Sequence, residues 1–169
     1  MKKIIISLAI ITSTAFSNEM VTVSFNEAKV TYKPLSSFTS LEDFEKSYKE
    51  AISRCKIDYR PARSCDLEEE IWDKELNYYY KALMNRLNPK DKKLLKVTQR
   101  KWLKYYNNIS KNIGKILDYN YPIQGTMYRD IRSDDYVSIM SKLKQDRTLF
   151  FKDILLDDNI DLSMYTMEF

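Results

Sequence analysis

The sequence predicts a mainly α-helical protein, a small helical bundle built on a central antiparallel helix hairpin, with a short extended or β-hairpin N-terminal arm. Glycine and proline are scarce, with 2 glycines and 4 prolines among 169 residues, whereas β-sandwiches and barrels need many turn residues. Hydrophobic residues make up 44% of the chain, which is enough for the core of one domain. Apolar residues recur at helical spacing through most of the chain.

The N-terminus has the pattern of an export signal. Lys2 and Lys3 precede the apolar run of residues 4–11, and residues 15–17 place small side chains at a cleavage position. The apolar run is far shorter than the ~20 residues that a membrane span requires. We therefore predict a signal peptide over residues 1–17 and an exported, periplasmic protein without a membrane span after cleavage.

Residues 18–39 are predicted to form an extended arm and linker. Within this segment, residues 20–33 alternate apolar and polar side chains in two short runs, which is typical of two short strands or an extended arm. An isolated β-hairpin is only marginally stable in water. We therefore expect the arm to dock on the helices.

The helical domain is predicted to span residues 40–157 and to begin with a helix that starts at Ser40. Asp43 stands where an approximate capping box requires an acidic residue. This first helix is expected to end near Cys55, and Pro61 marks the loop that follows it.

Two helices, over residues 66–87 and 89–113, form the predicted central hairpin. Asn88 caps the second of them, and Pro89 takes its first position, where the missing N–H of proline costs nothing. Because the break between the helices is so short, we expect them to fold back on each other as an antiparallel pair.

The C-terminal part of the chain is predicted to hold one more helix. Gly114 is expected to help end the preceding helix, and residues 118–128 have the composition of a loop. Ser133 is the expected cap of the final helix. Residues 158–169 are predicted to form a poorly ordered tail.

Cys55 and Cys65 bracket the loop between the first two helices. In an exported chain, two cysteines most simply form a disulfide, and the chain-entropy model assigns roughly 2.5–3 kcal/mol to so small a loop. A redox-active pair or a metal site is the alternative. Redox pairs usually have C-x-x-C spacing, and zinc needs four ligands, so we favour a structural disulfide.

Two neutral amides, Asn77 and Gln99, lie beside the apolar stripes of the hairpin helices. A buried amide needs several hydrogen bonds. We favour the interpretation that these side chains satisfy each other, or the backbone, across the hairpin and fix its register. Contact with a ligand is the alternative.

Arg147 falls between Leu143 and Phe150 on the inward stripe of the final helix. A guanidinium in that position needs an acidic partner or aromatic faces, because an unpaired buried charge is prohibitive. Asp73 and Glu75 are the candidate acids, and the many tyrosines offer stacking surfaces. A structural role is favoured over a functional site.

The start of the helix over residues 66–87 carries a run of carboxylates that forms a candidate binding patch for a basic partner. The run could equally be ordinary helix N-terminal charge, which the helix dipole favours. Arg100, Lys101 and Lys104 are its expected neighbours across the hairpin and would neutralise part of it. This acidic patch consists of Asp66, Glu68, Glu69, Glu70 and Asp73.

Catalysis has little support in the sequence. The chain has no histidine, so a Ser-His-Asp or Cys-His set cannot form, and its two glycines form no phosphate-binding loop. We expect a protein that is not an enzyme and needs no cofactor or metal. Removing Lys2 and Lys3 with the signal peptide lowers the formal net charge from +4 to +2, which predicts no nucleic-acid binding.

A set of spaced residues resembles the LprI-like lysozyme inhibitor family of small exported proteins. That family carries two cysteines, then a D-x-x-L-N-x-x-Y segment, then Q-x-x-W in the next helix. The likeness covers residues 50–113 well and continues weakly to Arg147, where the family tends to carry a helical arginine. The matching residues are Cys55, Cys65, Asp73, Leu76, Asn77, Tyr80, Gln99 and Trp102.

The chain also departs from the family pattern. Many members carry an arginine one helical turn after the tryptophan and a cysteine one turn further on, where this chain has Tyr106 and Ser110. A further cysteine of the last helix is also replaced, with Ile139 at about its position. These losses leave an even pair of cysteines, which supports pairing of Cys55 with Cys65.

The resemblance implies inhibition of lysozyme in the cell envelope by protein–protein binding. An inhibitor of this kind should cover a basic cleft that contains acidic groups with a complementary surface. The alternative is a non-catalytic interaction or scaffolding module of the cell envelope with another envelope protein as its partner.

Overall fold

The computed structural model describes residues 20–22, 29–58 and 65–157. The predicted signal peptide and the predicted C-terminal tail lie outside the described residues. No helix in the described part of the chain is long and apolar enough to span a membrane.

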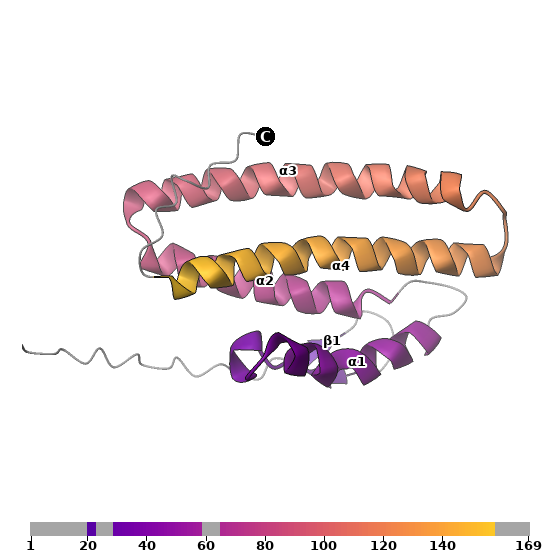
Figure 1. Ribbon diagram of the computed structural model, residues 1–169, viewed down its shortest axis with the longest axis horizontal. Helices are drawn as coiled ribbons and strands as arrows, with labels where there is room; N and C mark the ends of the chain where they lie inside the picture. The colour runs from indigo at the N-terminus through magenta and orange to yellow at the C-terminus, as the bar shows by residue number, and fades with distance from the viewer. Residues whose placement is uncertain (1–19, 23–28, 59–64, 158–169) are drawn as a thin grey trace, which may run out of the picture.

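Helices make up most of the described chain, as the sequence predicts (Figure 1). The helices are α1 (Leu41–Asp58), α2 (Leu67–Arg86), α3 (Pro89–Asn120) and α4 (Thr126–Leu156). Two short strands, β1 (Met20–Thr22) and β2 (Lys29–Thr31), and the 3-10 helix η1 (Leu35–Ser37) precede them. The predicted fold class, a helical bundle with a short N-terminal arm, is confirmed.

The central layers of the bundle are α2, α4 and α3. In Figure 1, α3 runs along one side of α4, α2 lies along the other side, and α1 lies beyond α2. The chain reverses direction after α2, where the Asn88 side chain accepts a hydrogen bond from the backbone N–H of Asp91 at 3.0 Å. The predicted antiparallel hairpin of α2 and α3 therefore forms, but the closest backbone packing of α2 is on α4.

Burial explains why α2 occupies the middle of the bundle. Its apolar residues are covered from more than one side, by α4 and by α1 with the arm. Phe44 of α1 packs on Trp72 of α2 with ring centroids 5.3 Å apart. The buried apolar residues of α2 are Leu67, Ile71, Trp72, Leu76, Tyr79 and Leu83.

The N-terminal arm contains the two predicted strands. β1 and β2 pair antiparallel, with Val21 opposite Val30, and the segment after β2 docks on the helices. The Tyr48 hydroxyl of α1 donates to the Lys33 carbonyl at 2.9 Å and accepts from the Lys33 backbone N–H at 2.7 Å. The expectation of an arm held by the helices is met.

Two local features of the first helix match the sequence prediction. The Ser40 hydroxyl accepts a hydrogen bond from the Asp43 backbone N–H at 3.0 Å, as a capping residue should. Cys55 and Cys65 form a disulfide with Cα atoms 5.6 Å apart. The disulfide ties the end of α1 to the start of α2.

The boundaries of the last two helices differ from the prediction. α3 continues through Gly114 to Asn120, and α4 begins at Thr126 rather than at Ser133. The predicted loop over residues 118–128 is therefore present but shorter, over residues 121–125. Gly125 precedes α4 with a φ of 156°, a conformation that favours glycine.

Candidate functional site

The residues of the family-like motif in α2 and α3 line a single groove. This groove has a volume of about 500 Å³ and also receives Lys144 from α4; we call it the motif groove. The motif residues that line it are Asp73, Leu76, Asn77, Tyr80, Gln99 and Trp102.

Helix geometry explains why these residues meet. Positions 73, 76, 77 and 80 are separated by three or four residues and therefore share one face of α2. Gln99 and Trp102 share one face of α3 for the same reason. Because α2 and α3 run antiparallel, the two faces oppose each other across the motif groove.

The two amides do not bond to each other. The Asn77 side-chain N–H donates to the Asp73 carbonyl at 2.8 Å and to the Asp73 carboxylate at 3.1 Å, within its own helix. The Gln99 side-chain oxygen accepts a hydrogen bond from Arg147 Nε at 3.2 Å. The prediction that they bond to each other across the hairpin is wrong, whereas the alternative of a backbone partner holds for Asn77, although within its own helix.

Arg147 lies among aromatic rings. Its guanidinium carbon is 4.4 Å from the ring centroid of Phe151, 5.2 Å from that of Phe150 and 5.9 Å from that of Trp102. One terminal nitrogen, Nη2, is buried and has no hydrogen-bond partner among the described residues. Burial lowers the pKa of the guanidinium to about 10, so the side chain remains charged at neutral pH. Aromatic faces are thus its main surroundings.

The two acids named as candidate partners of Arg147 bond elsewhere. Asp73 forms an ion pair with Lys144 at 3.0 Å. Glu75 accepts hydrogen bonds from the Tyr32 hydroxyl and from the Leu35 backbone N–H, the latter at 2.9 Å. Glu75 is fully buried, and this burial raises the pKa of its carboxyl. Its structural role is to hold the N-terminal arm against α2.

Sequence reasoning missed this role of Glu75, although a signal was present. Glu75 falls between Ile71 and Tyr79 at intervals of four residues, on a face that is apolar elsewhere. An acidic residue on such a face must find donors when it is buried. The sequence does not show that the donors come from the arm, which lies far away along the chain.

The aromatic pair of α3 connects the motif groove to the acidic patch. Trp102 and Tyr106 stack with ring centroids 5.2 Å apart and an interplanar angle of 30°. The Tyr106 hydroxyl donates to Glu69 at 2.6 Å, and Lys144 Nζ lies 5.5 Å from the Tyr106 ring centroid. Burial raises the pKa of Tyr106 above its ordinary value. Tyr106, which stands where many family members have an arginine, therefore contacts α2 and α4 within the bundle.

Most of the acidic patch lies on one side of α2, because positions 66, 69, 70 and 73 are three or four residues apart, whereas Glu68 lies on another side. Lys144 Nζ lies 3.0 Å from both the Glu69 and the Asp73 carboxylates. Lys56 of α1 lies 4.0 Å from Glu68. The predicted neutralising residues were Arg100, Lys101 and Lys104 of α3. The cations placed against these three acids come from α4 and α1 instead, because α2 packs most closely on α4.

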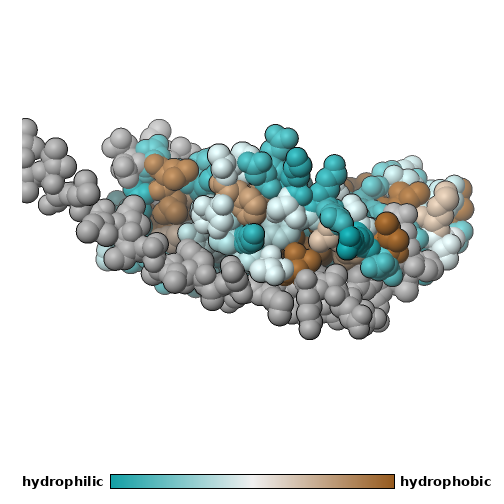
Figure 2. All heavy atoms as spheres, turned by 90° about the horizontal axis from the view of Figure 1, so that it is seen from below, coloured by the Kyte–Doolittle hydropathy of each residue, from teal (hydrophilic) through white to brown (hydrophobic). Residues whose placement is uncertain are grey.

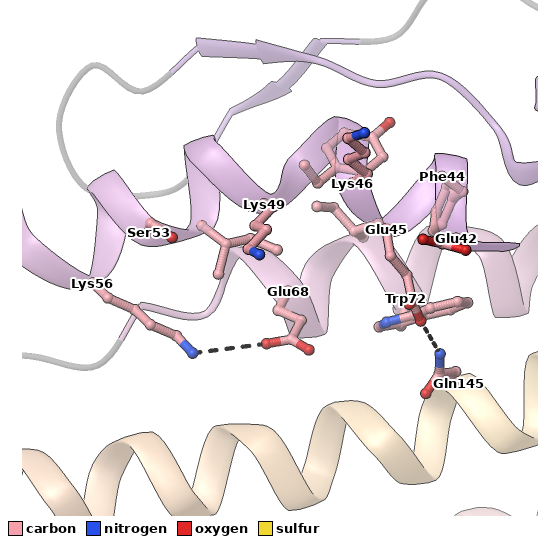
Figure 3. A pocket seen from close by; sticks show the side chains of 13 residues that line it. Glu42, Phe44, Glu45, Lys46, Lys49, Ser53, Lys56, Glu68, Trp72 and Gln145 are labelled. Carbon is pink, nitrogen blue, oxygen red and sulfur yellow. Dashed lines mark hydrogen bonds and ion pairs between the residues drawn. The ribbon is translucent and has the colours of Figure 1, made fainter.

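A second groove of about 700 Å³ lies between α1, α2 and α4; we call it the α1 groove (Figure 3). Gln145 donates to the Glu45 carboxylate at 2.5 Å and links α4 to α1 across one part of it. The Lys56–Glu68 ion pair links α1 to α2 at another part. Trp72 forms part of the apolar lining. Among the described residues, no cluster of three or more acidic, cysteine or histidine side chains could hold a metal ion.

The fold and this arrangement of motif residues define a small helical domain with a disulfide between its first two helices. A comparison with protein-family models matches residues 55–150 to the family described as lysozyme inhibitor LprI. The match covers more than half of the chain, and the protein belongs to this family. Comparisons with curated proteins and with solved structures found no match.

Proposed function

We propose that this protein is exported to the periplasm and inhibits lysozyme there by protein–protein binding. The observation that carries the proposal is the family match over residues 55–150, which begins at the disulfide and includes both halves of the motif groove. The family is described as one of inhibitors, which supports a role without catalysis. A disulfide between helices is also suited to an oxidising compartment.

The motif groove contributes to this function as a scaffold. Asp73 of the groove bonds to Lys144 and Asn77, which also line it, and Gln99 bonds to Arg147 of α4. Such bonds hold α2, α3 and α4 in one arrangement. A rigid scaffold lowers the entropy that binding must overcome, so a surface elsewhere on these helices can bind a partner with little rearrangement.

The acidic patch remains a proposed contact surface for a basic partner. Three of its five carboxylates, those of Glu68, Glu69 and Asp73, have cations beside them within the protein. Their attraction for an external cation is correspondingly reduced. Lys74 and Lys144 also act on the charge of Glu70, so the acidic patch keeps only part of its charge for an external cation.

A lysozyme turbidity assay tests the proposed function directly. Residues 18–169 are titrated into a suspension of bacterial cell walls with c-type, g-type or i-type lysozyme. We expect clearing to slow with at least one class as the ratio of protein to lysozyme rises. Unchanged clearing by every class at a large molar excess would contradict the proposal.

Tyr106 favours the second candidate function, an envelope interaction module with a different partner. Many family members carry arginine at this position, but here the side chain stacks on Trp102 and bonds to Glu69. A function that needs the arginine would therefore be lost. Capture of periplasmic proteins on the immobilised protein, compared with a matrix without protein, tests this candidate. A failure to enrich any protein would count against it.

A further inference from the structure

Positive charge is concentrated on α3. Its 32 residues include nine basic side chains and two acidic ones, whereas the chain without its predicted signal peptide has a formal net charge of only +2. The remainder of that chain is therefore acidic. An asymmetry of this kind indicates an anionic partner for the basic part, and the proposed function does not use it.

Most of these basic residues lie on one surface of α3, which we call the lysine face. Its positions are three or four residues apart and therefore form one row along the helix. Every residue of the row is exposed, and none is acidic. From Lys90 to Lys115 the row is about 37 Å long at the α-helical rise per residue. The lysine face consists of Lys90, Lys93, Val97, Lys101, Lys104, Asn108, Lys111, Lys115 and Tyr119.

The lysine face lies on the outer side of the bundle. Gln99, Trp102 and Tyr106 point from the opposite side of α3 and contact α4 or α2. In Figure 1, α3 runs along the upper side of the bundle with α4 below it. Figure 2 shows the molecule from below, the side away from α3, where both hydrophilic and hydrophobic side chains are visible. The row of exposed lysines is thus on the side of α3 that no other described helix covers.

Acidic side chains near the two ends of α3 are bonded to other residues. Asp91 accepts a hydrogen bond from the side chain that caps the helix. The Asp118 carboxylate lies 3.5 Å from Arg132, and the Asp135 carboxylate accepts a hydrogen bond from Tyr121 at 3.0 Å. Within the described ranges, no acid forms an ion pair with a residue of the lysine face.

The acidic patch does not neutralise the lysine face either. Lys144 of α4 lies between Glu69 and Asp73, 3.0 Å from each carboxylate. Lys101 and Lys104, which the sequence predicted to face these acids, remain exposed on the other side of α3. Their charges are therefore available to a partner outside the protein.

Two exposed apolar or aromatic side chains stand among the lysines of this row. Val97 lies midway between Lys93 and Lys101 and is 43% exposed, and Tyr119 follows Lys115 by one helical turn and is 84% exposed. A soluble phosphate polymer uses only the cations of such a surface. A lipid bilayer also takes up aromatic and apolar side chains at the level of its headgroups. The composition of the row therefore favours a bilayer.

We propose that α3 binds the surface of an anionic lipid bilayer, with the lysine face against the headgroup phosphates. The straight row brings all of its lysines to one plane, as a flat surface requires. The ammonium groups meet the phosphates while the apolar stems of the lysines lie along the boundary of the acyl chains. Val97 and Tyr119 enter the headgroup region between them. This surface association goes beyond the proposed function and leaves α1 and α2 on the side away from the bilayer.

Sedimentation with lipid vesicles tests the inference. Residues 18–169 are used, because they contain every described residue and lack the apolar run of residues 4–11, which would itself enter a bilayer. The anionic vesicles contain phosphatidylglycerol and phosphatidylcholine in equal parts, and the neutral vesicles contain phosphatidylcholine alone. We expect binding to the anionic vesicles only, and weaker binding as salt is added, because salt screens the charges. No binding to the anionic vesicles, or equal binding to both kinds, would overturn the inference.

Paired charge variants locate the binding surface. Lys101→Gln with Lys104→Gln removes two charges from the lysine face. The matched control is Lys46→Gln with Lys49→Gln, which removes the same charge from exposed positions of α1. Circular dichroism melting shows whether each variant is folded. We expect binding to the anionic vesicles to weaken by about tenfold or more in the first variant and by less than about twofold in the control. Equal weakening in the two folded variants would assign the binding to net charge and overturn the inference.

Inorganic polyphosphate distinguishes a bilayer from a soluble phosphate polymer. Val97→Ser with Tyr119→Ser removes the apolar and aromatic side chains of the lysine face and keeps every charge. We expect this variant to bind the anionic vesicles about threefold or more weakly and to bind polyphosphate as the wild type does. Unchanged vesicle binding by the variant would assign the lysine face to a soluble polyanion and overturn the inference. Tighter binding of the wild type to polyphosphate than to the vesicles, at equal phosphate concentration, would do the same.

Discussion

At the scale of single residues, Glu75 joins the N-terminal arm to α2 through hydrogen bonds from the Tyr32 hydroxyl and the Leu35 backbone N–H. One of its oxygens, Oε2, is buried and accepts no hydrogen bond from the part of the chain that the structure describes. Burial raises the pKa of this carboxyl above its ordinary value of 4.5, although the two hydrogen bonds and Lys152 oppose the shift. The free energy of unfolding should therefore depend on pH through the titration of Glu75.

The substitution Glu75→Gln isolates that dependence. Between pH 4.5 and the raised pKa, the folded state binds more protons at Glu75 than the unfolded state does, so stability falls as the pH rises. Glutamine keeps an acceptor oxygen and does not titrate. Thermal melting from about pH 4 to pH 7 should show that the wild type loses stability relative to the variant. Parallel curves for the two proteins would contradict this assignment.

The surroundings of Arg147 lead to a second prediction for a single residue. Its guanidinium bonds to Gln99 and lies over aromatic rings, but Nη2 finds no hydrogen-bond partner within the described ranges. Replacing a buried charge with an apolar side chain of similar length is often neutral or stabilising. We expect Arg147→Met to change the free energy of unfolding by less than about 1 kcal/mol, or to raise it, with lysozyme binding kept. Unchanged melting with lost binding would show that Arg147 belongs to the binding surface.

At the scale of elements, the disulfide connects two helices that pack little backbone against each other. The α1–α2 contact is much smaller than the contact between α2 and α4, so the bond between Cys55 and Cys65 holds the end of α1 in place. Cys55→Ser with Cys65→Ser is expected to lose about 2–3 kcal/mol in chemical denaturation. Reduction of the wild type should give the same loss. Equal stability of the oxidised and reduced proteins would contradict this role.

Substituting alanine for each of the two glycines is expected to change stability in opposite directions. Gly114 lies inside α3, and a Cβ added there would meet no atom within 4 Å, so Gly114→Ala should raise stability by about 0.5–1 kcal/mol. Gly125 precedes α4 at a φ of 156°, so Gly125→Ala should lower stability. Melting of the two variants beside the wild type checks the signs. The same sign for both would contradict the helix boundaries described here.

The sequence predicted the elements better than their ends. Helical spacing identified α2, and Asn88 and Pro89 located the start of α3. The end of α3 was missed because Gly114 and the polar residues after it have loop-like composition, whereas Leu117 is buried and the helix continues. α4 was predicted too short because it packs on both α2 and α3, so its apolar residues are spread around the helix and form no single stripe.

At the scale of the whole molecule, the sequence identified the residues of the motif groove but not their partners. Positions 73, 76, 77 and 80 were identified through the family resemblance, and their spacing is that of one helix face. The ion pairs of Lys144 with Glu69 and Asp73 were not predicted, because they depend on α4 lying against α2. Spacing along one helix is a local property, whereas the choice among distant partners depends on how all the helices pack.

The helical bundle has a centre that side-chain interactions hold together and an end that projects beyond this centre. Around the motif groove, α2, α3 and α4 are held by ion pairs, aromatic stacking and hydrogen bonds. The far ends of α3 and α4 extend beyond this centre (Figure 1).

Simultaneous measurement of lysozyme binding and lysozyme activity tests the central claim most directly. Titration calorimetry gives the fraction of lysozyme bound, and cell-wall clearing gives the remaining activity in the same mixtures. We expect saturable binding, with activity falling in proportion to the bound fraction. No saturable binding to any lysozyme class, or full activity of saturated lysozyme, would contradict it.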